Sequence, residues 1–369
     1  MGDLNIKTKT ASFKNALYLE SGRILEPFEI VYETYGTLNE AKDNAIVVCH
    51  ALSGSHHAAG RYENDKKAGW WDALIGGGKP IDTDRFFVIC ANAIGSCYGS
   101  TGPISPAYPS LEPYRLKFPV VTVKDMVKAE RLLLDRLGIN AVFAVIGGSM
   151  GGMRALHFAV DYPALAKRTI VMAATHATSP WAIAFNKIAM EATISDPAFE
   201  NGAYDIEALK ERGLKGAAIG RMAGHISFLS PESMNRKFGR DFVGAEGLFD
   251  LFGRFQVERY LDYNGGSFPK WFDPLSFLYI LKAINIYDIS RGYDSLESAL
   301  ARVKSHLHLF GFERDLLFLP RETQEIDAAM KKIGKGELSD YYHIESDYGH
   351  DSFLVETNKF ADILADILR

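Results

Sequence analysis

The chain has few of the features that mark several large classes of protein. Three of its 369 residues are cysteine, an odd number at spacings that suit no zinc site, so we expect a reducing compartment and no metal. No stretch reaches the roughly 18 consecutive apolar residues of a membrane-spanning helix. The first residues also lack an apolar core of signal-peptide length. We therefore expect a cytoplasmic protein that does not act at a membrane.

An excess of basic residues is also missing. The formal net charge is -5, from 41 lysine and arginine residues against 46 aspartate and glutamate residues. Domains that bind nucleic acid usually carry a basic excess, so nucleic acid is not an expected partner. The chain does have the composition of an ordinary globular protein, with 47% hydrophobic and 24% charged residues. Its length allows one large domain with an insertion, or two domains.

Short apolar runs alternate with helical patterns along much of the chain. Six segments have the pattern of strands, at 45–52, 85–92, 141–148, 168–174, 306–312 and 340–346; the first two are continuous, rich in β-forming residues and bounded by polar residues, as buried parallel strands should be. Apolar residues recur at helical spacing over 123–138, 150–163 and 353–368. Strands that alternate with helices in this way predict an α/β fold with parallel strands and right-handed crossovers.

The alternation of strands and helices is interrupted in the middle of the sequence. Residues 178–300 are rich in aromatic side chains and helical patterns, and no convincing strand pattern is found there. The simplest interpretation is a catalytic domain made of residues 1–177 and 301–369, with a helical lid inserted at 178–300. An all-helical second domain with its own core is the alternative.

The segment GGSMGG at 147–152 places four glycines around one serine. A phosphate-binding P-loop is excluded because its lysine position holds Met153, and G-x-G-x-x-G is excluded because Ser149 replaces its second glycine. The pattern that fits is G-x-S-x-G, which occurs once. In a nucleophile elbow, the serine lies on a tight turn from strand to helix and needs small neighbours. A strand is predicted before Ser149 and a helix after it, so we interpret Ser149 as a nucleophile; a close-packed turn without chemistry is the alternative.

A serine nucleophile needs a histidine as its base and an acid that orients the histidine. In α/β hydrolases the acid follows the serine along the chain, and the histidine follows the acid. His350 follows the last predicted strand in the loop SDYGHDSFL, and Asp315 follows the strand before it, with Glu313 as its nearest rival. The negative charge that develops on the substrate oxygen needs backbone N–H donors. We expect these from Met150, directly after the serine, and from Leu52, in the loop after an early strand.

Four segments resemble the signature segments of the homoserine O-acetyltransferase family: CHALSGSHHAAG (49–60), CANAIGSCYGSTGP (90–103), GGSMGGMRAL (147–156) and DYGHDSFL (347–354). The likeness extends over nearly the whole chain, including FQVERYLDYNG and FDPLSFLYILKAIN in the proposed insertion. It implies an α/β-hydrolase fold, with a mostly parallel central sheet and a helical lid insertion. It also implies a homodimer formed through that insertion.

The resemblance further implies roles for individual residues. Ser149, Asp315 and His350 correspond to the catalytic triad, Arg221 to a contact with the homoserine carboxylate, and Asp351 to a contact with the substrate amino group. Family members usually have a tyrosine seven residues after that arginine. This chain has phenylalanine at that position, residue 228, so any contact from a hydroxyl group there is absent.

The function that the resemblance predicts is acetyl transfer from acetyl-CoA to the hydroxyl of L-homoserine, a step of methionine biosynthesis, through an acetyl-serine. Acetyl-CoA is then a co-substrate, and no bound cofactor is expected. Homoserine O-succinyltransferase, serine O-acyltransferase, and esterase or thioesterase activity are the alternatives with the same triad. We expect aromatic residues of the insertion to keep water from the acetyl-serine: Trp181, Phe228, Phe252 and Phe277.

Overall fold

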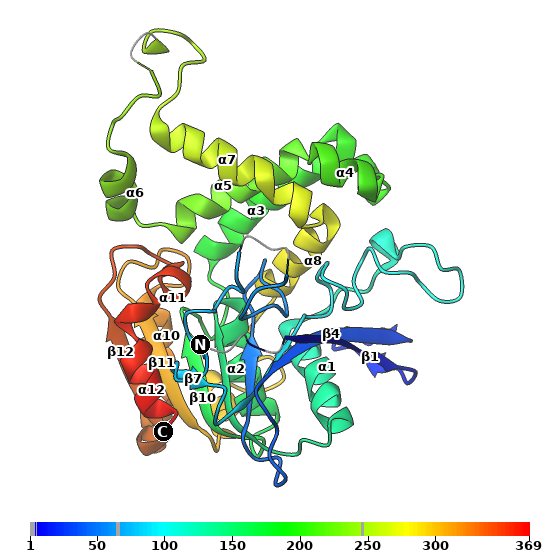
Figure 1. Ribbon diagram of the computed structural model, residues 1–369, viewed down its shortest axis with the longest axis vertical. Coiled ribbons are helices and arrows are strands. Elements are labelled where there is room, and N and C mark those ends of the chain that lie inside the picture. The colour runs from blue at the N-terminus through cyan, green and yellow to red at the C-terminus, as the bar shows by residue number, and fades with distance from the viewer. Residues whose placement is uncertain (1–3, 5, 64–66, 245–246) are drawn as a thin grey trace.

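The computed structural model describes residues 4, 6–63, 67–244 and 247–369 (Figure 1). Its centre is an eight-stranded sheet with the order β1-β4-β8-β5-β9-β10-β11-β12. The strands are β1 Lys7–Phe13, β4 Phe28–Tyr35, β5 Ala45–Cys49, β8 Phe87–Ala91, β9 Val142–Gly148, β10 Ala166–Met172, β11 His306–Phe312 and β12 Ser339–Ile344. All neighbours from β8 to β12 are parallel, whereas β1 and β4 pair antiparallel at one edge. The predicted α/β fold with a mostly parallel sheet is confirmed.

The six predicted strands are all present, with ends that differ from the prediction by a few residues. β5 is buried along its whole length, as its continuous apolar run predicted. The antiparallel strands β1 and β4 were not predicted. β1 is largely exposed and carries alternating lysine and threonine, so its sequence has no apolar run to mark it. Short strand pairs lie outside the main sheet, formed by β2 Leu17–Tyr18, β3 Ile24–Leu25, β6 Ile75–Gly76 and β7 Ile81–Asp82.

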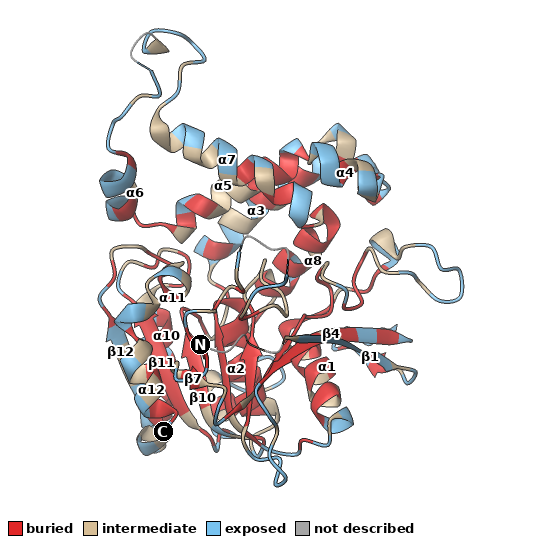
Figure 2. Ribbon diagram, in the orientation of Figure 1, coloured by how far each residue is buried: buried red, intermediate tan, exposed pale blue. Residues whose placement is uncertain are grey.

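Helices and loops cover both faces of the sheet. One face packs against α1 Val123–Arg136, α2 Met150–Asp161 and α10 Pro320–Lys332, whose apolar residues share a core with β5 and β9. The other face packs against α12 Ala361–Ile367 and the segment around Trp71. Figure 2 shows that the central strands are buried on both sides. This burial on two faces is what all-parallel sheets require.

The prediction of one closing helix over 353–368 is wrong. The structure has α11 Ser352–Val355, a short 3-10 turn Thr357–Lys359 and then α12. The breaks fall at Glu356 and Phe360, whose backbone angles are not helical. Two tertiary contacts account for the breaks: the Glu356 carboxylate accepts a hydrogen bond from the Ser346 hydroxyl, and the Phe360 ring packs on Phe310 in the sheet. Tertiary packing overrides the local helical pattern here.

The described residues of 178–300 form helices and connecting loops above the edge of the sheet where the parallel strands end (Figure 1). These helices are α3 Pro180–Ile194, α4 Ile206–Arg212, α5 Lys215–Phe228, α6 Pro231–Phe238, α7 Gln256–Trp271, α8 Pro274–Asn285 and α9 Leu296–Leu300. α5 packs against both α3 and α7, and Ile280 and Ala283 of α8 belong to the same core as α1, α2 and one face of the sheet. Within the described part of this segment no strand is assigned. We keep the name lid for residues 178–300; the domain boundaries themselves stay a prediction.

Short 3-10 helices complete the structure, at Arg115–Lys117, Pro197–Gly202 and Gly336–Leu338. Among the described residues, no helix has both the length and the apolar character needed to cross a membrane.

Candidate active site

Three of the predicted site residues meet at the ends of parallel strands. Ser149 follows β9, Asp315 follows β11, and His350 lies in the loop after β12. The Nε2 atom of His350 is 2.8 Å from the Oγ atom of Ser149, and its Nδ1 atom is 2.7 Å from Oδ2 of Asp315. All three side chains are buried. The structure therefore brings together Ser149, His350 and Asp315, whereas no contact with His350 is recorded for Glu313.

The turn at Ser149 has the strained backbone of a nucleophile elbow. Ser149 has φ 59° and ψ −128°, a conformation that is unfavourable for residues with a side chain. Its neighbours must be glycine because other atoms come very close. A Cβ atom on Gly151 would lie 2.0 Å from the carbonyl oxygen of Cys49, and one on Gly148 would lie 2.3 Å from the Phe353 ring. The glycines thus allow α2 and the elbow to pack directly on neighbouring backbone and side chains.

The Asp315 carboxylate is oriented by backbone groups. Its Oδ1 atom accepts hydrogen bonds from the N–H groups of Leu317, at 2.8 Å, and Phe318, at 2.9 Å. The Oδ2 atom is left to accept from Nδ1 of His350. Burial lowers the pKa of His350, but the charge and hydrogen bond of Asp315, helped by Asp351, raise it more, so the net shift is upward. An Nδ1–H held by Asp315 leaves Nε2 as the acceptor for the serine proton.

A cavity opens directly above Ser149, between the sheet edge and the lid. It encloses about 830 Å³ of empty space, part of which is open solvent. Its wall includes Ser149 and His350, together with apolar side chains from the lid such as Phe228 and Phe277. Two other aromatic residues expected to narrow the approach do not line it: the side chains of Trp181 and Phe252 are exposed.

The two residues predicted to supply backbone donors for the oxyanion both border the site, because Met150 follows Ser149 directly and Leu52 lines the cavity. Met150 is the first residue of α2, so its N–H has no acceptor inside the helix. Leu52 lines the cavity in a loop that follows β5 and turns through a hydrogen bond from the N–H of Gly54 to the carbonyl of Ala51. The arrangement fits a pair of donors around an oxygen bound to Ser149.

Arg221 and Asp351, predicted to bind substrate, both line the same cavity. Arg221 is on α5, and its guanidinium lies over the rings of Phe228, at 5.2 Å, and Phe268, at 4.9 Å. Burial raises the pKa of the Asp351 carboxyl, while the positive charges of His350 and Arg221 oppose that rise. Arg221 therefore presents a positive charge, and Asp351 a carboxyl group, to one small cavity next to Ser149.

The loop that contains His350 is hydrogen-bonded to the lid. The N–H of Ser230, at the start of α6, donates to the carbonyl of Tyr348 at 2.8 Å, and the N–H of Asp351 donates to the carbonyl of Phe228 at 3.2 Å. Gly349 has φ +104°, and a Cβ atom there would lie 2.7 Å from the nitrogen of Ser230. Glycine is therefore required for this close approach. The lid and the proposed base are held as one unit.

A buried ion pair beneath the cavity was missed from the sequence. Arg154 on α2 is fully buried and pairs with Glu130 on α1. Its Nη1 atom also donates to the carbonyl of His50 at 3.2 Å, and Nη2 donates to the carbonyl of Ala91 at 3.4 Å. An arginine on the buried side of a glycine-rich helix is the signal that could have revealed it, because buried charges are normally paired.

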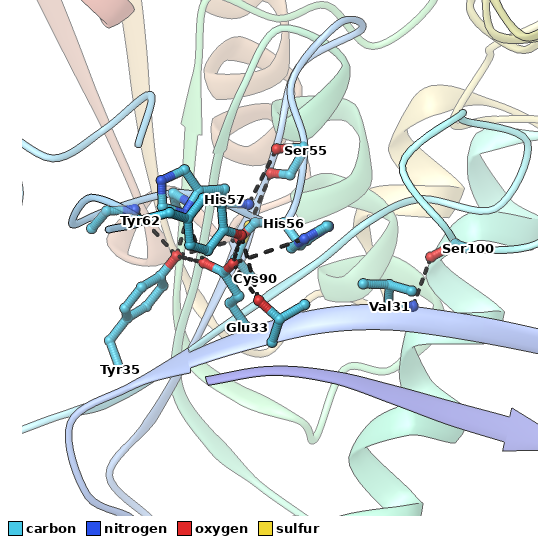
Figure 3. A network of polar contacts seen from close by, with 12 residues as sticks. Val31, Glu33, Tyr35, Ser55, His56, His57, Tyr62, Cys90 and Ser100 are labelled. Atoms are coloured by element: carbon cyan, nitrogen blue, oxygen red, sulfur yellow. Dashed lines mark hydrogen bonds and ion pairs between the residues drawn. The ribbon is translucent and has the colours of Figure 1, made fainter. Parts of the chain in front are cut away.

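A second missed group surrounds Glu33 on β4, as Figure 3 shows. This buried carboxylate accepts hydrogen bonds from side chains of several segments, among them His57 of the loop that carries Leu52. A glutamate within a strand that is mostly buried could have suggested a polar cluster.

One group in the described part of the chain has the side chains to hold a metal ion: His306, His308 and Asp340. These residues lie near the starts of β11 and β12, at the opposite end of the strands from Ser149. Asp340 already accepts a hydrogen bond from Nε2 of His306 at 2.7 Å, and Arg168 lies opposite His306 on β10. We assign this group no part in the chemistry at Ser149.

The fold and the triad geometry define the class to which the chain belongs. A serine on a strained strand–helix turn, with an acid and a histidine after later strands of a mostly parallel sheet, is the arrangement of α/β hydrolases. In agreement, a family model described as the alpha/beta hydrolase fold matches residues 44–248.

Similarity to individual proteins narrows this class to one family. A homoserine O-acetyltransferase of Sulfurimonas autotrophica is 63% identical over 365 residues, which cover 99% of each chain. The crystal structure of homoserine O-acetyltransferase from Bacillus anthracis superposes with a TM-score of 0.92 at 29% identity, over 100% of this chain and 98% of that one. The crystal structure of esterase E22 has a TM-score of 0.89, also at 29% identity, over 99% and 100% of the two chains. The chain belongs to the homoserine O-acetyltransferase family.

Proposed function

We propose that this protein transfers an acetyl group from acetyl-CoA to the hydroxyl of L-homoserine, giving O-acetyl-L-homoserine and CoA. The observation that carries the proposal is the cavity itself, in which Ser149 and His350 lie together with a cation, Arg221, and a carboxyl group, Asp351. A nucleophile beside one cation and one acid suits an amino-acid acceptor. The family membership supports the same reaction, because the relatives carry that name.

The first half-reaction makes an acetyl-serine. The Oγ atom of Ser149 attacks the thioester carbonyl carbon while its proton passes to Nε2 of His350, 2.8 Å away. The N–H groups of Leu52 and Met150 stabilise the oxyanion, and losing one such donor costs about 3 kcal/mol of transition-state stabilisation. The carbon–sulfur bond then breaks, His350 returns the proton to the sulfur, and CoA leaves as the free thiol.

The second half-reaction uses the same groups in the opposite direction. The hydroxyl of homoserine gives its proton to Nε2 of His350 and attacks the acetyl carbon, and the proton then passes to Oγ of Ser149 as that oxygen leaves. General base catalysis of this kind contributes about 10²–10⁴ in rate. Asp315 keeps the imidazole in the required tautomer and stabilises its positive charge. Every proton and acyl group is accounted for without a metal or bound cofactor.

Recognition of homoserine follows from the charges at the cavity. The Arg221 guanidinium can grip both oxygens of the substrate carboxylate, because its donors are arranged as a fork. The rings of Phe228 and Phe268 lie against that guanidinium and help to hold it in place. Asp351 takes the ammonium group. Phe228 contributes apolar surface to this region and no hydroxyl group.

Transfer must outpace hydrolysis of the acetyl-serine. The cavity walls are largely apolar side chains of the lid and the sheet edge, which leaves water few partners there. An esterase has a similar structure, with a TM-score of 0.89 to this chain, and an esterase transfers its acyl group to water. Water is therefore the competing acceptor that must be tested.

We also propose that two copies of the chain associate through the lid, as the family resemblance implies. The segment before α7 carries Phe249, Leu251 and Phe252 with 97%, 86% and 84% of their surface exposed. Large apolar side chains grouped in this way are typical of a surface that a partner covers. A cytoplasmic location stays a prediction from composition.

The proposed function is tested by measuring thiol release from acetyl-CoA, with and without L-homoserine. We expect fast release with homoserine, slow release without it, and neither with the Ser149→Ala variant. Fast release that does not depend on homoserine would identify a thioesterase. Release from succinyl-CoA but not acetyl-CoA would identify a succinyltransferase, and L-serine in place of homoserine tests the other acceptor.

A further inference from the structure

We propose that Glu33 is a positioning residue for catalysis, which fixes the loop of residues 50–57 and thereby the N–H group of Leu52. This inference rests on the proposed acyl transfer and extends it to a residue that touches neither substrate nor serine. The loop of residues 50–57 is called the oxyanion loop below.

Glu33 is a carboxylate placed where a charged group is costly. It lies in β4, next to β1 and β8, and has 0% of its surface exposed. Burying such a group is unfavourable unless hydrogen bonds replace the lost water. Hydroxyl groups supply part of that replacement: Thr8 donates to Oε1 at 2.9 Å, Tyr35 donates to Oε2 at 2.5 Å, and Tyr62 donates to Oε1.

The remaining donor comes from the oxyanion loop itself. The Nδ1 atom of His57 is 3.0 Å from Oε2 of Glu33, and the Nε2 atom of His56 is 3.8 Å from Oε1. Since an ionised carboxylate only accepts hydrogen bonds, Nδ1 of His57 carries the proton in this pair. Figure 3 shows both imidazole rings close to the same carboxylate. Glu33 therefore accepts a hydrogen bond from His57 at the end of the loop, and His56 lies next to the same carboxylate without a hydrogen bond to it.

Tyr35 extends this hold to the backbone. Its hydroxyl donates its one proton to Glu33 and accepts hydrogen bonds from the N–H groups of Ala58, at 2.8 Å, and Ala59, at 3.2 Å. Because Glu33 takes the proton, the oxygen lone pairs of Tyr35 remain directed at the two amides. One carboxylate thus orders a side chain of the loop and the backbone directly after it.

The other end of the oxyanion loop is held by different groups. The carbonyl of His50 accepts from Arg154 at 3.2 Å, and Nε2 of His50 accepts from the N–H of Ala93 at 2.9 Å. Leu52 lies between this fixed end and the end that Glu33 holds. Release of either end leaves the Leu52 N–H free to shift away from the position that an oxyanion requires, and shifts of about 1 Å are costly in catalysis.

The charge of Glu33 is maintained at neutral pH. Burial raises its pKa, but hydrogen bonds from His57, Tyr35 and Tyr62 and the charge of His57 together lower it below the ordinary value. The group is ionised and acts purely as an acceptor, which is the property that all its partners need.

The test is the Glu33→Gln variant, assayed by homoserine-dependent thiol release from acetyl-CoA. Glutamine has nearly the same shape, but its NH₂ group cannot accept the bonds that tyrosine and histidine donate. We expect kcat per acylatable Ser149 to fall about tenfold or more, with the KM for L-homoserine within about twofold of the wild-type value. A role in stability alone would lower the melting temperature or the number of active sites and leave kcat per site unchanged.

A matched control lies on the same strand. Glu29 of β4 is exposed, and its carboxylate accepts a hydrogen bond from the Ser12 hydroxyl at 2.6 Å, on a strand position outside the oxyanion loop contacts described above. Glu29→Gln is expected to leave both kinetic constants unchanged. An equal loss in the two variants would overturn the proposal, because it would show that any charge removed from β4 has the same effect.

A double-mutant cycle identifies the path of the effect. If Glu33 acts through the loop histidine, Glu33→Gln, His57→Gln and the double variant lose similar amounts of kcat; losses that multiply would overturn the proposal. If Glu33→Gln fails to fold, Tyr35→Phe and His57→Gln must each lower kcat. Wild-type protein that releases no thiol would overturn the proposed function, whereas active wild type with an unaffected Glu33→Gln would overturn the positioning role alone.

Discussion

Replacement of Gly151 by alanine perturbs the site at one defined contact. The new Cβ atom would lie 2.0 Å from the carbonyl oxygen of Cys49 and 3.1 Å from that of His50. Ordinary contact begins at 3.4 Å, so the first distance falls short by 1.4 Å. Both neighbouring atoms are backbone at the end of β5, just before Leu52. Relief of the clash therefore requires α2 and the start of the oxyanion loop to separate by more than about 1 Å.

Such a separation should reduce catalysis more than substrate binding. A misplacement of about 1 Å costs on the order of 10² in rate, and overpacking a buried site costs about 1–3 kcal/mol of folding stability. We expect kcat of the Gly151→Ala variant to fall on the order of 100-fold while the KM for homoserine changes little. The assays are thiol release from acetyl-CoA and urea-induced unfolding.

Gly266→Ala is the matched control. Gly266 lies inside α7, is exposed, and has no atom within 4 Å of where its Cβ would be. Alanine there should stabilise the helix by about 0.5–1 kcal/mol and leave kcat unchanged. The expected loss is on the order of 100-fold. A folded Gly151→Ala protein whose kcat stays within about threefold of the wild-type value would therefore refute the link between this contact and the oxyanion donors.

Three further variants test the acid of the triad, the arginine proposed to bind the substrate carboxylate, and the exposed surface of the lid. Asp315→Asn should reduce kcat on the order of 10⁴-fold. It should also move the acidic limb of kcat/KM to lower pH, because loss of the carboxylate leaves burial to lower the pKa of His350, as a pH–rate profile would show. Arg221→Ala should raise the KM for L-homoserine about 10- to 100-fold, while the acetylation of Ser149 by acetyl-CoA keeps its rate; a slower acetylation would contradict a role confined to homoserine. Phe249→Ser combined with Phe252→Ser should yield monomers in sedimentation velocity, and dimers that persist would place the interface elsewhere.

The parts of the fold that could be predicted are those in which local sequence and burial agree. β5 and β9 are apolar throughout because both faces of a parallel sheet are covered, so their runs stand out. The order serine, acid, histidine could then be assigned, since parallel strands end at the same edge and bring Ser149, Asp315 and His350 together. The glycines around Ser149 were a further signal in the sequence, because the turn is too crowded for larger residues at those positions.

The parts that escaped prediction depend on contacts between distant segments. The exposed strand β1 is held in the sheet by its backbone pairing with β4. Because this pairing does not require buried side chains, the sequence of β1 contains no apolar run that would mark it as a strand. The closing helix is broken by the packing of Phe360 and by the hydrogen bond to Glu356, neither of which is visible locally. Glu33 could not be recognised as a buried acceptor because three of its hydrogen-bonding partners, Thr8, His57 and Tyr62, lie on other segments of the chain, up to 29 residues away.

The acetyl-serine is the central claim, and its direct detection is the decisive measurement. Wild-type protein is mixed with acetyl-CoA without L-homoserine, stopped in acid, and analysed by mass spectrometry of the intact chain and of the peptide that contains Ser149. We predict one acetyl group on Ser149, which disappears on addition of L-homoserine as O-acetyl-L-homoserine forms, and no acetyl group on Ser149→Ala. Turnover by wild-type protein that never carries an acetyl group, or acetyl transfer by Ser149→Ala at the wild-type rate, would contradict this claim.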